Sequence, residues 1–268
     1  MASPLFEISG MSAGYGAVRV LDQVCLSVAA GEIVILAGRN GAGRSTLARA
    51  AMGLLEASGV VRLNGVDLST QAAFRRARAG LGYVPERRDI FSALTVDENL
   101  RLGARVRRGH ASRFTRDDVL QHFPPLARRL QAPAGALSGG EQQMLALCRS
   151  LLGDPDLLIA DEPAEGVAPA YRLVIAECLR GLAERGMGIL WIEQRLGAAL
   201  DVATRIDVMG HGRIVYSGTP VALRERPDVL RTWLAAAGRE AAQPAGLDDG
   251  AVAATSQAQP AVGSSHDS

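Results

Sequence analysis

Residues 32–46, EIVILAGRNGAGRST, constrain this chain more than any other stretch. The apolar, β-branched run at 32–38 ends in glycine and predicts a buried strand. The residues after it carry the spacing G-x-x-x-x-G-x-[ST], and the segment TLARAAMGLL that follows predicts a helix. A glycine-rich turn between a strand and a helix is the setting of a phosphate-binding loop. The sequence therefore predicts a site for a phosphorylated ligand.

The residue types in this loop suit phosphate chemistry. Backbone N–H groups and the positive end of the following helix attract the phosphates, and Gly38, Gly41 and Gly43 let the backbone wrap closely around them. The Ser45 hydroxyl is expected to ligate Mg²⁺, and Thr46 to reach a phosphate oxygen. The other loop residues expected to contact the ligand are Arg39, Asn40, Ala42 and Arg44.

Arg44 stands where such loops normally carry lysine. The chain contains no lysine, and all 29 of its basic residues are arginine, so Arg44 can follow a chain-wide bias or a local requirement. Both cations neutralise phosphate charge, but guanidinium is broad and planar whereas ammonium is compact. A loop sized for ammonium would lose aligned transition-state contacts to arginine, at a cost of about 10²-fold in rate. We therefore expect hydrolysis that is slow if Arg44 fits badly.

Two more apolar runs predict buried strands that end in polar residues. PDLLIADEP, residues 155–163, contains Asp161 and Glu162, and MGILWIEQ at 187–194 ends in Glu-Gln. Strands that alternate with helices predict an α/β fold with a mainly parallel sheet, which binds ligands beyond the carboxyl ends of its strands. Asp161 is expected to hold Mg²⁺ through water, and Glu162 is expected to be the general base for the attacking water.

Other segments are predicted from their turns and composition. Hairpins are expected at 60–68, around Asn-Gly, and at 205–218, around His-Gly. Residues 97–135 are rich in arginine and predict a helical subdomain broken by Pro124-Pro125. From residue 238 onward Ala, Gln, Pro, Gly and Ser dominate, and we expect a disordered tail.

The overall composition excludes several classes of protein. The chain has 268 residues, 48% hydrophobic content and a net charge of +1, so neither charge nor composition predicts a nucleic-acid partner. Its apolar runs are too short to span a bilayer. No signal peptide is visible at the N-terminus, and three widely spaced cysteines are expected to be reduced thiols.

The segment LSGGEQQ, residues 137–143, adds a third motif in a characteristic order. Together with GRNGAGRST and LLIADEP it resembles the ATP-binding subunits of ABC transporters, over roughly residues 5–235. The resemblance implies an α/β fold: a P-loop NTPase core of ABC ATPase type with an antiparallel β subdomain and a helical signature subdomain. It implies a domain at 5–237, a helical subdomain at about 88–153, and a tail at 238–268.

The resemblance also implies that two subunits enclose two ATP molecules with Mg²⁺. The γ-phosphate held by the partner's loop would be contacted by the signature residues Ser138, Gly139, Gly140 and Glu141. A serine hydroxyl and glycine N–H groups at a helix N-terminus form an anion site. The same residues can instead serve only as a helix cap.

Three further positions match family positions around the nucleotide. Tyr15 matches the aromatic residue that stacks on adenine, although a lone tyrosine near a strand is more often a packing residue. Glu86 stands where a glutamine usually bridges Mg²⁺ and water, and could bind the metal more strongly or repel the γ-phosphate. A direct Arg44–Glu86 pair is an open alternative. Gln194 stands where many members have a switch histidine, and its amide can still bond a phosphate.

Residues 81–100 and EGVAP at 165–169 resemble ATPases of branched-chain amino-acid importers in particular. The implied function is ATP hydrolysis that energises import of branched-chain amino acids or related amides. The implied partners are a second ATPase subunit and separate transmembrane permease subunits, which would hold the chain at the cytoplasmic face of the cell membrane. The alternative is a catalytically impaired, ATP-binding subunit of a heterodimeric complex. An ABC ATPase of the DNA-repair type is disfavoured because no long heptad insertion separates the motifs.

Overall fold

The computed structural model describes residues 4–104 and 113–234. The predicted tail lies outside the described residues, as do the last three residues of the predicted domain. The strands are β1 (Phe6–Tyr15), β2 (Val18–Val28), β3 (Ile33–Gly38), β4 (Ala57–Leu63), β5 (Val66–Asp67), β6 (Leu81–Val84), β7 (Leu157–Asp161), β8 (Gly188–Glu193), β9 (Arg205–Gly210) and β10 (Arg213–Gly218). The helices are α1 (Arg44–Ala51), α2 (Ala73–Ala79), α3 (Val96–Gly103), α4 (Arg116–His122), α5 (Pro124–Ala127), α6 (Gly139–Leu151), α7 (Pro169–Glu184), α8 (Ala199–Val202), α9 (Pro220–Arg224) and α10 (Pro227–Leu234), with a 3₁₀ turn at Ala134–Ala136.

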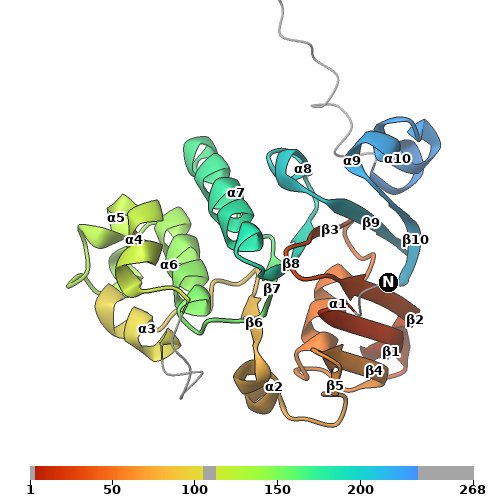
Figure 1. Cartoon of the computed structure of the whole chain (residues 1–268), viewed down its shortest axis with the longest axis horizontal. Coiled ribbons are helices and arrows are strands. Elements are labelled where there is room, and N and C mark those ends of the chain that lie inside the picture. The colour runs from red at the N-terminus through yellow and green to blue at the C-terminus, as the bar shows by residue number, and fades with distance from the viewer. Residues whose placement is uncertain (1–3, 105–112, 235–268) are drawn as a thin grey trace, which may run out of the picture.

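A six-stranded sheet forms the centre of the described part of the chain. Its strand order is β10-β9-β3-β8-β7-β6, and every neighbouring pair is parallel except β10 with β9. The three predicted buried strands, β3, β7 and β8, are adjacent in the middle of this sheet (Figure 1). The predicted α/β fold with a mainly parallel sheet is thereby confirmed.

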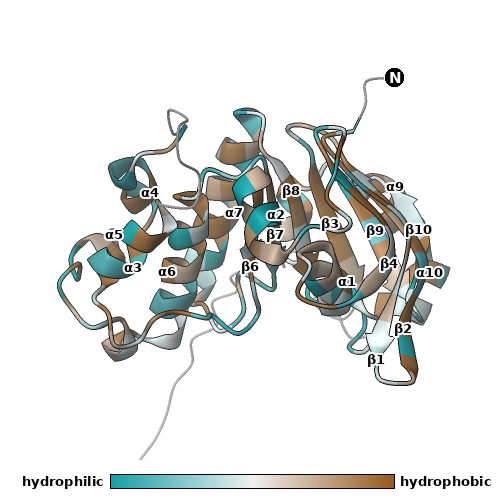
Figure 2. Cartoon of the chain, turned by 90° about the horizontal axis from the view of Figure 1, so that it is seen from below, coloured by the Kyte–Doolittle hydropathy of each residue, from teal (hydrophilic) through white to brown (hydrophobic). Residues whose placement is uncertain are grey.

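Strand β3 is buried on both faces, which explains why its sequence is uniformly apolar rather than alternating. Ile33, Ile35 and Ala37 point into a core shared with helices α6 and α7. Val34 and Leu36 point to the other face, into a core shared with α1 and strands β1, β2 and β4. Figure 2 shows the same strand as a hydrophobic band between the two layers.

Both predicted hairpins are present. Strands β4 and β5 are joined at Asn64-Gly65, and β9 and β10 at His211-Gly212. All four turn residues have positive φ values between 48° and 77°, as a two-residue turn requires to match the twist of its strands. Strands β4 and β5 complete an antiparallel sheet of order β2-β1-β4-β5, which agrees with the expected antiparallel β subdomain.

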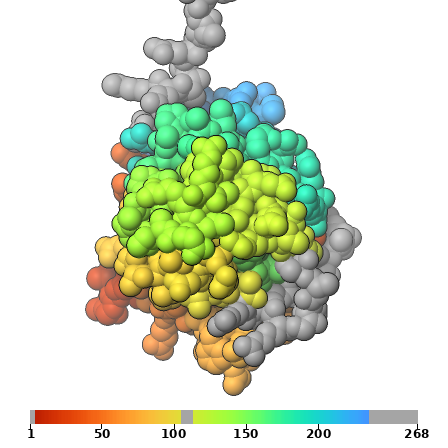
Figure 3. Space-filling view, turned by 90° about the vertical axis from the view of Figure 1, so that its left-hand side faces the viewer, coloured from red at the N-terminus to blue at the C-terminus, as the bar shows by residue number. Residues whose placement is uncertain are grey.

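Helices α3 to α6 gather at one end of the molecule, beyond the edge strand β6 (Figure 1). Figure 3 looks onto this end, where these helices form most of the visible face. Helices α3 and α6 approach closely at Gly103. A Cβ on this residue would lie only 2.1 Å from the carbonyl oxygen of Arg149. The predicted break at Pro124 is the start of α5, where proline needs no N–H donor.

No helix in residues 4–104 and 113–234 has the length and apolar character needed to cross a bilayer.

Candidate functional site

The predicted phosphate loop connects β3 to α1. Its Gly41 and Gly43 have φ values of 80° and 107°, in the left-handed region that side chains disfavour. At Gly38 the constraint is space, because a Cβ there would lie 2.5 Å from the carbonyl oxygen of Met209. The shape of the loop therefore requires all three glycines.

The turn between β9 and β10 supports the loop from a distant part of the sequence. The Gly212 N–H donates to the carbonyl oxygen of Ala42 at 3.0 Å. A Cβ on Gly212 would lie 2.0 Å from the carbonyl oxygen of Val20, so only glycine fits between β2 and the loop. The sequence identified this position as a turn, but no local signal pointed to its contact with the loop.

Arg44 turns inward from the first residue of α1 and is only 6% exposed. Its Nη2 donates to Glu162 Oε1 at 3.2 Å and lies 3.4 Å from Asn40 Oδ1. Glu86 lies on the loop after β6 and its residue is exposed. Arg44 therefore pairs with the predicted general base, and the alternative pair with Glu86 is not formed.

Asp161 is the last residue of β7 and Glu162 follows it, at the carboxyl edge of the sheet, as predicted. Glu162 has a φ of 49°, and its backbone N–H donates to the carbonyl oxygen of Ile192 on β8 at 3.0 Å. This bond pins the turn after β7 to the neighbouring strand. The left-handed conformation costs a non-glycine residue of order 1 kcal/mol, and the bond to β8 helps to maintain it.

Burial dominates the acid–base behaviour of this edge. It raises the pKa of Asp161 to about 6, against the opposing effects of the Ser45 hydroxyl and Arg44. It raises the pKa of Glu162 to about 7, although the Arg44 cation acts in the opposite direction. A carboxyl group with a pKa near neutrality is suited to exchanging a proton with water.

Two buried polar atoms at this edge have no hydrogen-bond partner. They are Arg44 Nη1 and Asp161 Oδ1. One is a cationic donor and the other an anionic acceptor, and a buried polar group without a partner costs free energy. They leave a donor available for an anion and an acceptor available for a cation.

Strand β8 brings a further acid that the sequence analysis did not single out. Glu193 accepts backbone N–H groups of Gln194 and Arg195 at 3.1 and 3.2 Å, and the indole N–H of Trp191 at 3.4 Å. Burial raises the pKa of Glu193. The signal was available, since the residue ends an apolar run predicted to be a buried strand with a polar end. Gln194 lies next to it, half-buried, at the same edge.

The signature segment begins α6. Ser138 is its N-cap, and the Glu141 N–H donates to the Ser138 hydroxyl while the Ser138 N–H donates to the Glu141 carboxylate. Arg129 forms a 3.1 Å ion pair with Glu141. A Cβ on Gly139 would lie 2.8 Å from Arg88 Nη2, so this guanidinium lies beside the start of the helix. The capping role of these residues is therefore present.

The signature does not lie at the phosphate loop of its own chain. Helix α6 and helix α1 lie on opposite sides of β6 in Figures 1 and 2. Tyr15, by contrast, ends β1 near α1, where its ring is 45% exposed. The Arg49 guanidinium of α1 lies 5.9 Å from the ring centre, a contact that sequence reasoning missed.

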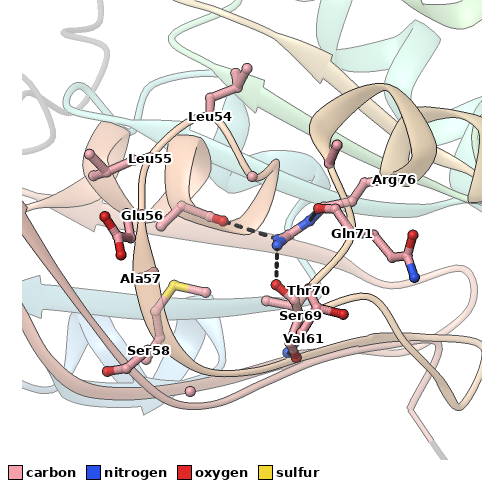
Figure 4. A pocket seen from close by; sticks show the side chains of 15 residues that line it. Leu54, Leu55, Glu56, Ala57, Ser58, Val61, Ser69, Thr70, Gln71 and Arg76 are labelled. Atoms are coloured by element: carbon pink, nitrogen blue, oxygen red, sulfur yellow. Dashed lines mark hydrogen bonds between the residues drawn. The ribbon is translucent and has the colours of Figure 1, made fainter.

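A separate pocket of about 450 Å³ lies at the far end of α1 from the phosphate loop (Figure 4). Its walls come from Met11, Ala50, residues 53–59, Val61, residues 69–72 and Arg76. The buried Arg76 donates to four carbonyl oxygens here, those of Gln71, Ala50, Ala51 and Ser69. Because every guanidinium nitrogen already donates to a backbone carbonyl, Arg76 ties α1 to the neighbouring loop.

The sequence matches a known protein family and several of its members. Residues 21–165 match the family model described as ABC transporter. The high-affinity branched-chain amino acid transport ATP-binding protein of Pseudomonas aeruginosa is 40% identical over 231 residues, which cover 86% of this chain and 99% of that protein.

Two further matches extend the comparison. The lipopolysaccharide export system ATP-binding protein of Haemophilus influenzae is 32% identical over 234 residues, covering 86% of this chain and 97% of that protein. A solved structure of an ATP-binding subunit of an ABC transporter aligns with a TM-score of 0.75 and 30% identity, covering 89% of this chain and all of that one.

Proposed function

This chain belongs to the ABC transporter family of ATPases, and on that basis we propose that it binds and hydrolyses ATP to energise solute import through a separate membrane permease. The observation that carries the proposal is the meeting of three features at one sheet edge. These are the glycine-constrained loop after β3, the buried Asp161 at the end of β7, and Glu162 beside it.

Binding of the ATP phosphates is assigned to the loop at residues 38–46. The backbone of Gly41 and Gly43 has the conformation that turns N–H groups inward, and α1 starts directly behind them. The free Nη1 of Arg44 adds a buried cationic donor. Tyr15 has an exposed aromatic face near the same helix, and we assign it to the adenine ring.

Magnesium is part of the proposal because the residues present fit it. The unpartnered Asp161 Oδ1 and the Ser45 hydroxyl are hard oxygen donors of the kind Mg²⁺ prefers. Within residues 4–104 and 113–234, no group of three or more His, Cys, Asp or Glu side chains is arranged to hold a metal ion. Bound Mg²⁺ would neutralise phosphate charge, and Glu86 is a further candidate ligand.

Glu162 is assigned as the general base, and Gln194 as the amide that bonds the γ-phosphate. A base with a pKa of about 7 can accept a proton from water at neutral pH. The ion pair with Arg44 opposes this role, because a carboxylate oxygen that accepts from Arg44 is less available to accept a proton from water. We therefore propose hydrolysis that is slower than a lysine at position 44 would allow.

Completion of the site is assigned to a second ATPase subunit. Ser138, Gly139, Gly140 and Glu141 lie across β6 from α1, so within one chain they have no nucleotide to contact. In a face-to-face pair, each signature helix would present its N-terminus to the ATP on the partner's loop. The dimer could be homomeric or formed with a sister chain.

Branched-chain amino acids or related amides are the proposed cargo. The Pseudomonas aeruginosa protein, which is named for branched-chain amino acid transport, supports the choice through its 40% identity. The lipopolysaccharide export protein is less similar, at 32% identity. The proposed permease would hold the chain on the cytoplasmic face of the membrane.

One observation favours a second function. Arg44 occupies the phosphate loop and engages the general base, which suits a subunit that binds ATP without turnover and lends its signature to a competent sister chain. Under this alternative the chain alone would bind Mg-ATP without hydrolysis. Activity would appear only on mixing with the sister ATPase.

Turnover of Mg-ATP by the purified chain tests the proposal. The Glu162→Gln variant should lose about 10²-fold or more of the rate, the contribution typical of a general base. Glu165→Gln is the matched control, because Glu165 is an exposed carboxylate in the same loop and its rate should stay near the native one. Equal turnover by the native chain and Glu162→Gln would remove the hydrolytic function.

A further inference from the structure

The ion pair between Arg44 and Glu162 connects the phosphate loop to the turn that follows β7. The Arg44 side chain is 7% exposed and the Glu162 side chain 15% exposed. The same Nη2 that contacts Glu162 also lies 3.4 Å from Asn40 Oδ1 within the loop. The guanidinium is therefore held between two acceptors on different elements.

Only half of the guanidinium fork is used in this arrangement. Nη1 is buried and has no hydrogen-bond partner. Guanidinium is suited to donating two parallel bonds to one oxyanion, as in its pairs with carboxylates and phosphates. The guanidinium can therefore form one more bond than Glu162 accepts from it. A phosphate at this loop would supply oxygens for both nitrogens.

We propose that Arg44 is a positioning residue that holds Glu162 in the nucleotide-free chain and exchanges it for phosphate oxygens when nucleotide binds. The inference rests on the proposed function and deepens it, because it makes release of the general base depend on occupancy of the loop. Until the exchange occurs, Glu162 accepts from Arg44 and is not free to accept from water.

The exchange follows from competition for one group. Nucleotide phosphate and the Glu162 carboxylate both need the same guanidinium, so Glu162 weakens nucleotide binding by the free energy of its ion pair. By reciprocity, bound nucleotide weakens the ion pair by the same amount. A compact ammonium cannot give phosphate the second, parallel bond that the unpartnered Nη1 of Arg44 would supply, so we expect the coupling to depend on arginine.

A double-mutant cycle on ADP affinity tests the exchange without hydrolysis or dimer formation. The four proteins are the native chain, Glu162→Gln, Arg44→Lys and the double variant, each titrated with ADP by calorimetry. In the native background, Glu162→Gln should tighten ADP binding by about tenfold, within the range measured for residues in direct contact. In the Arg44→Lys background the same substitution should change affinity much less.

Glu165→Gln controls for the loss of one negative charge near the phosphates. Equal tightening by Glu162→Gln and Glu165→Gln, or by Glu162→Gln in both backgrounds, would overturn the inference. If Arg44→Lys does not fold, Arg44→Met provides the second background, since it retains most of the buried stem. Failure of every protein to bind ADP would instead defeat the proposed function, which separates the two outcomes.

Discussion

At the scale of single residues, buried charges determine what the sheet edge can do. Burial raises the pKa values of three carboxyl groups here, those of Asp161, Glu162 and Glu193. The positive charge of Arg44 opposes this rise in all three. A buried ion pair contributes little net stability, but an uncompensated buried charge is costly. Arg44 supplies the compensating cation near these acids. The carboxylate that it contacts, Glu162, is not available to another hydrogen-bond donor on that side.

Substitution of Arg44 by lysine should speed hydrolysis. Lysine would fit a loop sized for ammonium and restore aligned transition-state contacts, so we expect a rise of about 10²-fold in turnover, in the range of a single transition-state contact. Steady-state Mg-ATP hydrolysis measures it, with the exposed Arg128→Lys as control. Unchanged or slower turnover would show that Arg44 already fits the loop.

At the scale of elements, helix caps position the site as well as stabilise it. Helices α3, α4 and α6 each begin with a capping box, formed by Thr95 with Glu98, Thr115 with Asp118, and Ser138 with Glu141. In α6 the cap orders the residues proposed to contact the partner's ATP. Ser138 can therefore serve both as a helix cap and as a phosphate contact, because a capped N-terminus is also an ordered anion site.

Loss of a cap distant from the site should affect stability alone. Thr95 Oγ accepts the Glu98 N–H at 3.1 Å, and Thr95→Ala should lower the free energy of unfolding by about 1 kcal/mol. Urea unfolding measures the loss, and Thr70→Ala is the matched control on an exposed threonine. A loss equal to that of the control would argue against the cap.

The same cap has a defined pH dependence. Bonds from the Thr95 backbone and side chain lower the pKa of Glu98. Stability from a carboxylate with a lowered pKa is present above its unfolded value of about 4.3 and is lost as pH falls through the folded value. The effect of Thr95→Ala on unfolding should therefore diminish below about pH 4.

At the scale of the whole molecule, the fold separates the two halves of a nucleotide site. The phosphate loop lies beside the antiparallel sheet, and the signature begins a helix on the other side of β6. A single chain therefore presents two separate surfaces that are both suited to phosphate. In the proposed dimer, nucleotide would lie between the loop of one subunit and the signature of the other.

Nucleotide should drive association of the Glu162→Gln chain. With saturating Mg-ATP this variant retains nucleotide, and light scattering should report a twofold gain in mass. Adding Ser138→Glu should abolish association, because a carboxylate would face the partner's phosphates, while leaving each chain able to bind nucleotide. A Glu162→Gln chain that stays monomeric, even with its permease present, would contradict the two-subunit site.

Much of the fold followed from short-range patterns. The runs at 32–38, 155–163 and 187–194 predicted β3, β7 and β8, because strands buried on both faces must be uniformly apolar. Asn-Gly and His-Gly predicted their hairpins, because those turns need positive φ. Glu193 was not singled out, because only the pairing of β7 with β8 brings it close to Asp161 and Glu162.

By itself, the sequence determined the fold class and the family, since residue types at fixed spacings specify the loop, the acids and the signature. Only the tertiary structure decided that Arg44 pairs with Glu162 rather than Glu86, and that Gly212 supports Ala42. Those contacts join residues far apart in the chain. Their distances depend on how strands align across the sheet and on which side chain lies nearest in a buried space, and no local spacing encodes either.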